Sequence, residues 1–274
     1  MGGRKFALLL LLPCTLFVTV FLLLPLFATL LSTLFGADGF SLAGYASTLG
    51  DSYFQEVFWR SIRLSVLTTL ICLVLGFPVA YYIARLTRRR GLCIALALFP
   101  LMTSPVVRSF AWMVILGKKG MVNGVLMGAG LISEPMSLLY NEFSIVVGLV
   151  QLFLPMMIIS TVGVMENIDD DLVLAANSLG SSRTSTFWRV ICPLSVPGLI
   201  TGSVLVFCGS ITAYTTPQLL GGSDTRMMAT LIYQQALSLN DWMGASVVAL
   251  IMICVSVVVT ELINRLAQRV NPAA

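Results

Sequence analysis

Six long apolar stretches constrain this chain more than any other feature; they cover about 7–32, 62–86, 92–116, 143–164, 196–219 and 244–266. An α-helix rises about 1.5 Å per residue, so roughly 20 apolar residues cross a hydrocarbon core of about 30 Å. Each stretch reaches that length. Only 10% of the residues are charged, against about 25% in soluble domains. The sequence therefore predicts an all-α polytopic membrane protein, a single domain over residues 1–274 with six transmembrane helices.

Three absences exclude most enzymatic functions. The chain has no histidine, which removes histidine acid–base chemistry and the commonest zinc ligand. It has no GxxxxGK[ST] phosphate loop, so we do not expect it to hydrolyse nucleotide. The six cysteines lie in apolar segments without CxxC spacing and are interpreted as small apolar residues, not as metal ligands or disulfides. We predict a protein that is not an enzyme and that binds no cofactor or metal.

Basic residues gather at one end of the predicted spans when six helices alternate across the membrane. The positive-inside rule makes that side cytoplasmic, which places both termini in the cytoplasm. The first apolar run exceeds the roughly 7–15 residues of a signal-peptide core and is predicted to be an uncleaved signal anchor. The basic clusters lack interleaved aromatic residues, so no nucleic acid is expected as a partner. The basic residues on this side are Arg4, Lys5, Arg85, Arg88, Arg89, Arg90, Arg183, Arg189, Arg265 and Arg269.

Two connections on the opposite side are too polar or too broken to span. The first, about 33–61, contains turn signals; we predict an extracytoplasmic loop with a short surface helix around Phe54 to Trp59. The second, from Lys118 to Asn141, mixes apolar residues with several glycines and a proline. It is predicted to be an interfacial or lid-like segment.

The connection between the fourth and fifth spans is the largest polar segment on the predicted cytoplasmic side. Asp169–Asp171 favour the N-terminus of a helix through Leu172–Leu179, an interpretation preferred to a cation site. Gly180 supplies the turn that ends this helix, and two serines cap a second helix that starts at Arg183 and ends before Pro193. We predict two short helices with a glycine elbow; the alternative is an ordinary polar loop.

The same connection carries a spaced motif. The pattern is Ala-Ala, three residues, Gly, nine residues, an aliphatic residue, two residues and Pro, matched at Ala175, Ala176, Gly180, Val190 and Pro193. It resembles the EAA loop of binding-protein-dependent ABC importer permeases, which forms the coupling helices that dock into a groove of the cytoplasmic ATPase subunit. The resemblance implies a coupling loop over about 165–195. Its expected coupling residues are Asp171, Leu174, Ala175, Ala176, Leu179, Gly180, Arg183 and Pro193.

One position departs from the family pattern. Leu174 stands where the family has a glutamate, so the charged contact that this glutamate would offer the ATPase is missing. Asp171 and Glu166 are two candidates to compensate, and the sequence leaves open whether either does so.

Two further segments resemble the spermidine/putrescine permease branch of this family. One is Arg108-Ser109-Phe110-Ala111-Trp112 with Leu116-Gly117, Gly120 and Asn123; the other is Thr216-Pro217-Gln218-Leu219-Leu220-Gly221-Gly222 with Met228 and Gln234. The resemblance implies half of a pore in the bacterial cytoplasmic (inner) membrane. A second permease subunit, related or identical, completes the pore. Two ATP-binding cassette subunits bind ATP-Mg and hydrolyse it, and an extracytoplasmic solute-binding protein delivers a small polar solute.

The resemblance makes a polyamine-like solute the first expectation. Opines, aminophosphonates, thiamine and ferric iron stay open, because the same branch includes importers for them. An autonomous secondary transporter is a less favoured alternative, since the sequence does not clearly show either repeated halves or buried carboxylates. A membrane assembly or anchor protein without transport is a third class.

Polar residues within the spans are the candidates for a solute pathway. Arg108 lies about 24 Å along its predicted span by helical rise, so it either snorkels to the outer surface or lines the outer mouth. The others either hydrogen-bond between helices or face the pathway, because polar atoms in lipid are costly. Small residues at Gly198 and Gly202 predict close helix packing. The pathway candidates are Arg108, Gln151, Ser210, Tyr214 and Thr216.

Overall fold

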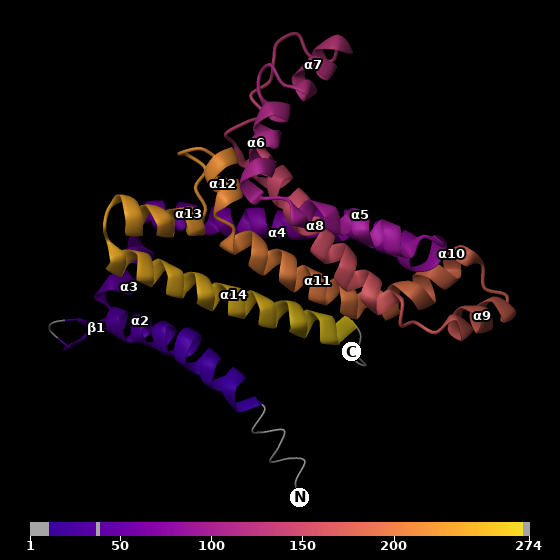
Figure 1. Cartoon of the computed structure of the whole chain (residues 1–274), viewed down its shortest axis with the longest axis horizontal. Helices are drawn as coiled ribbons and strands as arrows, with labels where there is room; N and C mark the ends of the chain where they lie inside the picture. Colours follow the sequence, from indigo (N-terminus) through magenta and orange to yellow (C-terminus); the bar gives the residue numbers. More distant parts are fainter. Residues whose placement is uncertain (1–10, 37–38, 271–274) are drawn as a thin grey trace, which may run out of the picture. The chain divides into compact units, whose positions relative to one another are not determined.

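The computed structural model describes residues 11–36 and 39–270, which are mostly helical (Figure 1). Six helical segments within these residues are long and apolar enough to cross a membrane. The predicted all-α architecture with six membrane-length helices is therefore confirmed. The segments are Leu11–Leu34, Ser52–Leu86, Pro105–Gly128, Glu142–Met165, Arg183–Thr212 and Trp242–Arg265.

The helices include four π-helical turns, labelled η, and the two short strands form a hairpin in the register Phe35↔Phe40 and Gly36↔Gly39. The elements are η1 (Thr19–Leu23), α2 (Leu24–Leu34), β1 (Phe35–Gly36), β2 (Gly39–Phe40), α3 (Ala43–Gly50), α4 (Ser52–Tyr81), η2 (Tyr82–Leu86), α5 (Arg90–Met102), α6 (Pro105–Leu116), α7 (Met121–Gly128), α8 (Glu142–Met165), α9 (Asp170–Ser178), α10 (Arg183–Thr186), η3 (Phe187–Ile191), α11 (Cys192–Thr212), α12 (Thr215–Leu220), α13 (Met228–Tyr233), η4 (Gln234–Ser238) and α14 (Trp242–Val270).

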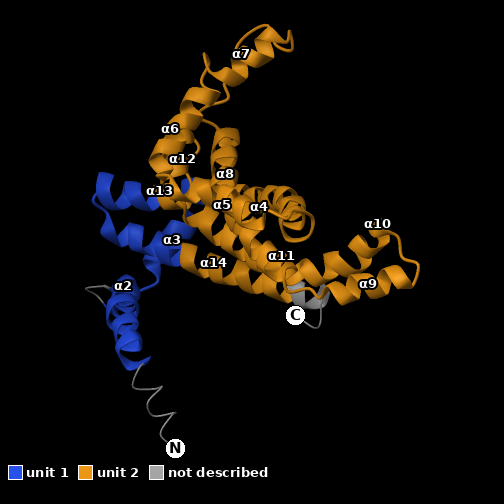
Figure 2. Cartoon of the chain, turned by 45° about the vertical axis from the view of Figure 1, so that its right-hand side comes forward, with its two compact units in different colours: residues 1–55, 231–251 blue, residues 56–230, 252–274 orange. Residues whose placement is uncertain are grey.

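The chain divides into two compact units (Figure 2). One consists of residues 1–55 and 231–251, and the other of residues 56–230 and 252–274. Every predicted functional residue belongs to the second unit. The sequence signals for a cytoplasmic N-terminus, Arg4 and Lys5, lie outside the described residues, as do residues 7–10 of the first predicted span.

The core of the second unit is built around α8, which has more buried residues than any other helix described. α11 packs against it through small residues. A Cβ atom added to Gly202 would lie 2.5 Å from Ser160 Oγ and 2.6 Å from Met157 Sδ. The close packing predicted at this glycine is confirmed, because a side chain there would displace Ser160 and Met157.

The second span differs from its prediction. α4 begins at Ser52, so the separate surface helix expected around Phe54 to Trp59 and the start near residue 62 are both wrong. Asp51 explains the early start. Its Oδ1 accepts a hydrogen bond from the Tyr53 N–H at 3.3 Å and its Oδ2 from the Phe54 N–H at 3.2 Å, which satisfies amide groups that lack partners at a helix N-terminus.

The third predicted span, 92–116, is not one helix. α5 and α6 are separated by Thr103 and Ser104, whose ψ angles of 147° and 134° are extended. Pro105 causes the break, because its ring disfavours the helical conformation in the preceding residue. By length and hydropathy the membrane-length segment is instead Pro105–Gly128, which includes α7. The lid-like role of the connection from Lys118 stays a prediction.

The fifth predicted span, 196–219, is displaced towards the N-terminus. Its membrane-length segment starts at Arg183 and ends at Thr212. Ala213, with ψ of 126°, interrupts the helix, and α12 follows as a separate short helix.

Candidate functional site

The connection between α8 and α11 contains the short helix α9. Asp169 is its N-cap, and the Asp169 Oδ1 atom accepts a hydrogen bond from the Asp171 N–H at 3.0 Å. The helix runs over Asp170–Ser178, which confirms the predicted helix with an aspartate cap, shifted by one or two residues at each end. No residue of α9 is buried.

Gly180 forms the elbow after α9. Its φ is +84°, a conformation that glycine adopts without strain. The Gly180 N–H donates to the Asn177 carbonyl at 3.0 Å, and the Ser181 N–H donates to the Ala176 carbonyl at 3.0 Å. These two bonds make a Schellman motif, which satisfies carbonyl groups at the end of the helix. The predicted glycine turn is confirmed.

The second short helix does not end before Pro193, contrary to prediction. Ser182 caps α10 by accepting from the Ser185 N–H at 3.2 Å, and the helix then continues through η3 into α11. In η3 the Cys192 N–H bonds to the Phe187 carbonyl five residues back. Pro193 follows this π turn by two residues, and its missing N–H interrupts the hydrogen-bond ladder without ending the helix. A continuous helix therefore connects the elbow to the bundle.

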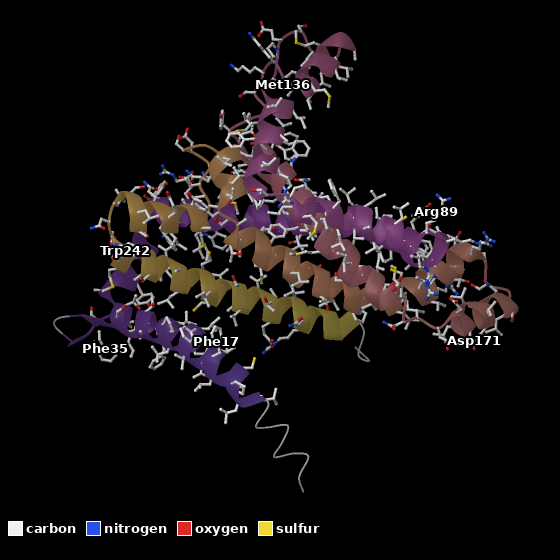
Figure 3. The ribbon with its side chains drawn as sticks, in the orientation of Figure 1. Phe17, Phe35, Arg89, Met136, Asp171 and Trp242 are labelled. Carbon is white, nitrogen blue, oxygen red and sulfur yellow. The ribbon has the colours of Figure 1, made fainter. Side chains whose placement is uncertain are left out.

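Arg85, at the end of η2, fixes the start of α9. Its side chain is only 12% exposed; Nη1 forms an ion pair with the Asp170 carboxylate, and Nη2 donates to the Ile168 carbonyl at 2.6 Å. Ile168 packs in a cluster with Ala84 and Met165, at the ends of η2 and α8. α9 and the loop that carries Arg89 therefore lie at the same end of this unit (Figure 3).

A polar cavity of about 450 Å³ separates this basic loop from the start of α9. Both basic and acidic side chains line it, so it has no uniform charge. The lining residues are Ala84, Arg85, Arg90, Glu166, Asn167, Ile168, Asp169 and Asp170. Glu166 thus lines the same cavity as Arg85 and Arg90.

A larger cavity of about 700 Å³ lies among α4, α6 and α8. The Gln151 Oε1 atom on α8 accepts a hydrogen bond from the Trp112 Nε1 on α6 at 3.4 Å, and both side chains line the cavity. Arg63 and Glu142 are the other polar residues of its wall. The remaining lining residues are Leu64, Leu67, Ile71, Leu75, Phe143, Val146, Val147, Val150 and Leu154.

Glu142, the first residue of α8, joins a small charge network. Arg63 Nη2 donates to both carboxylate oxygens of Glu142, at 2.5 and 2.6 Å, and Arg60 Nε lies 3.3 Å from Oε1. Arg60 also pairs with Glu56. A third cavity, of about 420 Å³, is lined by Glu56, Trp59, Arg60 and Arg63.

Sequence reasoning missed this charge network. Glu56, Arg60 and Arg63 are spaced i, i+4, i+7 on one helix face, a signal that could have been found. Glu142 could not have been paired with them, because it is 79 residues from Arg63.

The other predicted pathway residues do not line the 700 Å³ cavity. Arg108 donates from Nη1 to the Pro100 carbonyl at 2.6 Å and so caps the end of α5. Ser210 and Thr216 are buried, and Thr216 packs against α8 at Gly148, where a Cβ atom would lie 2.5 Å from its Cγ2. Tyr214 immediately precedes α12. Among the five candidates, the structure brings only Gln151 to this cavity.

The family of this chain follows from comparison with known protein families. The family model of the binding-protein-dependent transport system inner membrane component matches residues 76–272. This chain belongs to that family. The match includes Arg85, α9 and the elbow at Gly180. The predicted resemblance is confirmed, and the chain is a permease subunit of an ABC importer.

Named relatives of this permease include three with extensive coverage. The spermidine/putrescine transport system permease protein PotB of Escherichia coli (strain K12) is 33% identical over 204 residues, 74% of this chain and 74% of that protein. PotB of Haemophilus influenzae is 30% identical over 259 residues, 89% of this chain and 91% of that protein. The molybdenum transport system permease protein ModB of Mycobacterium bovis is 29% identical over 209 residues, 75% of this permease and 76% of ModB.

A solved structure shares the fold of this permease. A chain of the bacterial alginate ABC transporter, in complex with a periplasmic protein bound to an alginate pentasaccharide, superposes with a TM-score of 0.79. The alignment covers 97% of this permease and 96% of that chain at 18% identity. At that identity the likeness establishes the fold.

Proposed function

We propose that this permease forms half of the route by which a polyamine-like solute enters a bacterial cell across the cytoplasmic membrane. A second permease subunit, related or identical, forms the other half. Two ATP-binding cassette subunits bind ATP-Mg and hydrolyse it, and an extracytoplasmic binding protein delivers the solute. The PotB relatives, at 30–33% identity, support this solute class. The ModB relative, at 29% identity, makes molybdenum transport the second candidate.

The observation that carries the proposal is the exposed helix–elbow–helix formed by α9, Gly180 and α10. We propose that α9 docks on the ATPase subunit. Arg85 ties the start of α9 to η2, and the continuous helix through η3 ties the elbow to α11. A displacement of α9 by the ATPase would therefore be transmitted to two membrane helices, the one that ends in η2 and α11. This docking also requires α9 and the arginines of the η2–α5 loop to be cytoplasmic, with both termini on the same side.

The 700 Å³ cavity is the proposed solute route. A polyamine alternates ammonium groups with apolar methylene segments. The cavity offers apolar walls between the Glu142 carboxylate and the Trp112–Gln151 pair, and a tryptophan face attracts cations. In this structure the Arg63 guanidinium is paired with the Glu142 carboxylate, and the Arg63 side chain is 66% exposed. An ammonium group of the solute can therefore displace Arg63 from Glu142.

Gly180 allows a sharp test in proteoliposomes that contain the assembled transporter. We expect Gly180→Leu to insert normally but to lower ATP-dependent uptake of spermidine at least about tenfold, because the elbow requires a positive φ. Gly130 is a matched control: its φ is +72° and, as at Gly180, a Cβ atom would meet nothing within 4 Å. Gly130→Leu should keep uptake within about twofold of wild type. Equal uptake by both variants would contradict the docking role.

A further inference from the structure

The outward face of α9 shows which group contacts the ATPase. We propose that the Asp171 carboxylate supplies the charged contact of this helix, that it meets a basic group of the ATPase subunit, and that leucines around it make an apolar seal. The inference rests on the proposed function and adds the chemistry of the docking surface.

The structure distinguishes the three consecutive aspartates. Asp169 uses its carboxylate to cap α9. Asp170 uses its carboxylate to bind Arg85. The Asp171 side chain is exposed and has no hydrogen bond or ion pair with the residues that the structure describes. Asp171 is therefore the aspartate available to a partner.

Helical geometry places exposed leucines on both sides of Asp171. At about 100° per residue, Leu172 and Leu179 lie within about 20° of each other on one side of Asp171, and Leu174 lies about 60° away on the other side. These leucines are 47%, 89% and 60% exposed. Val173 is partly buried. Exposed Ser178 and Ala175 lie nearest to Asp171, within about 40°, and the three leucines flank this small-residue strip.

Charge complementarity identifies the occupant as a protein with a basic group. α9 carries no basic residue, and a carboxylate on its exposed face is repelled by anionic lipid headgroups. Covering the leucines removes water from Asp171, and a desolvated charge is costly unless it is paired. Arginine suits such a contact because its planar guanidinium binds carboxylates bidentately. The ATPase surface is therefore expected to present a basic residue within an apolar groove.

The positions of Asp171 and Glu166 favour Asp171 as the replacement for the missing glutamate contact. Glu166 lies at the end of α8 and lines the polar cavity that also contains Arg85 and Arg90. Asp171 precedes Leu174 by three residues, so the two Cβ atoms lie roughly 5–6 Å apart on one helix face. Asp171 therefore replaces the glutamate contact from an adjacent position.

Affinity between the intact permease pair and its purified ATPase subunits tests the inference. We expect Asp171→Asn to raise the Kd at least about tenfold and to make binding less sensitive to salt, because a desolvated charge pair is lost. Glu166→Gln is the matched control and should leave the Kd within about twofold. In the double variant Asp171→Asn with Leu174→Glu, the carboxylate returns one turn later, and the Kd should recover to within about threefold of wild type.

The rescue separates charge recognition from helix stability. A glutamate at position 174 lies beyond the first turn of α9, so it cannot replace the favourable interaction of Asp171 with the helix dipole. A wild-type Kd for Asp171→Asn, an equal loss for Glu166→Gln, or failure of the double variant to recover would each overturn the inference. If Gly180→Leu still blocks uptake in those cases, docking by α9 stands and only the Asp171 contact is wrong.

Discussion

Removing the Arg85 side chain should detach α9 from the membrane helices. The Nη2 hydrogen bond to the Ile168 carbonyl has a charged donor and a side chain that is only 12% exposed, so it contributes about 1.5–3 kcal/mol. The ion pair to Asp170 adds about 0–1 kcal/mol, because that carboxylate is 84% exposed. Arg85→Ala therefore costs about 2–3 kcal/mol of local stability. The population with α9 detached rises roughly 30-fold or more.

Amide hydrogen exchange of the permease pair in lipid nanodiscs measures this directly. In Arg85→Ala, the amides of α9 should exchange roughly 30-fold faster than in wild type. Asp170→Asn removes only the exposed ion pair, so the increase should stay below about fivefold. The assembled transporter with Arg85→Ala should hydrolyse more ATP per solute molecule imported, because the movement of α9 is no longer transmitted to η2. Exchange within twofold of wild type in Arg85→Ala, or equal increases in the two variants, would refute the tether.

Three further sets of substitutions have defined expectations. Gly202→Val should prevent stable assembly of the α8–α11 core. The control Gly163→Ala should leave the thermal midpoint unchanged, because a Cβ atom there meets nothing within 4 Å. Both variants are checked by thermal unfolding in detergent. Glu142→Gln and Gln151→Leu should each raise the KM for spermidine uptake several-fold while the ATPase remains bound, and an unchanged KM in both would remove the cavity from the solute route. Asp51→Ala should lower the free energy of unfolding by about 1 kcal/mol through loss of the α4 cap.

Apolar run length and local capping signals predicted much of this fold. Membrane-length runs gave six spans because length and hydropathy alone decide whether a helix can cross a bilayer. α9 and its glycine elbow were also predictable, since Asp169 and Gly180 act through hydrogen bonds to neighbouring residues. In each case the cause lies within a few residues of its effect.

Span boundaries depended on competing local effects that hydropathy does not weigh. Pro105 broke an apolar run that otherwise looked continuous, and a π turn carried the helix past Pro193, where a helix end was expected. Both prolines had the same sequence signal with opposite outcomes. The difference is that Pro105 begins a new helix after extended residues, whereas Pro193 follows a π turn inside a continuous helix.

Contacts between distant residues were beyond reach of sequence reasoning. The pairing of Arg63 with Glu142 and of Arg85 with Asp170 joins residues 79 and 85 positions apart, and no local pattern encodes either pair. The same holds for the cavity that contains Gln151, since α4, α6 and α8 each contribute part of its wall. Arg108, in contrast, was singled out as a charge in an apolar run, and the structure uses it to cap α5.

Solute uptake with and without the ATPase subunits tests the central claim most directly. The permease pair is reconstituted in liposomes with a saturating extracytoplasmic binding protein and labelled spermidine, either alone or with the two ATP-binding cassette subunits and internal ATP-Mg. We expect uptake only in the complete system, and loss of that uptake in Gly180→Leu. Concentrative spermidine uptake by the permease chains alone would contradict it and would indicate an autonomous transporter.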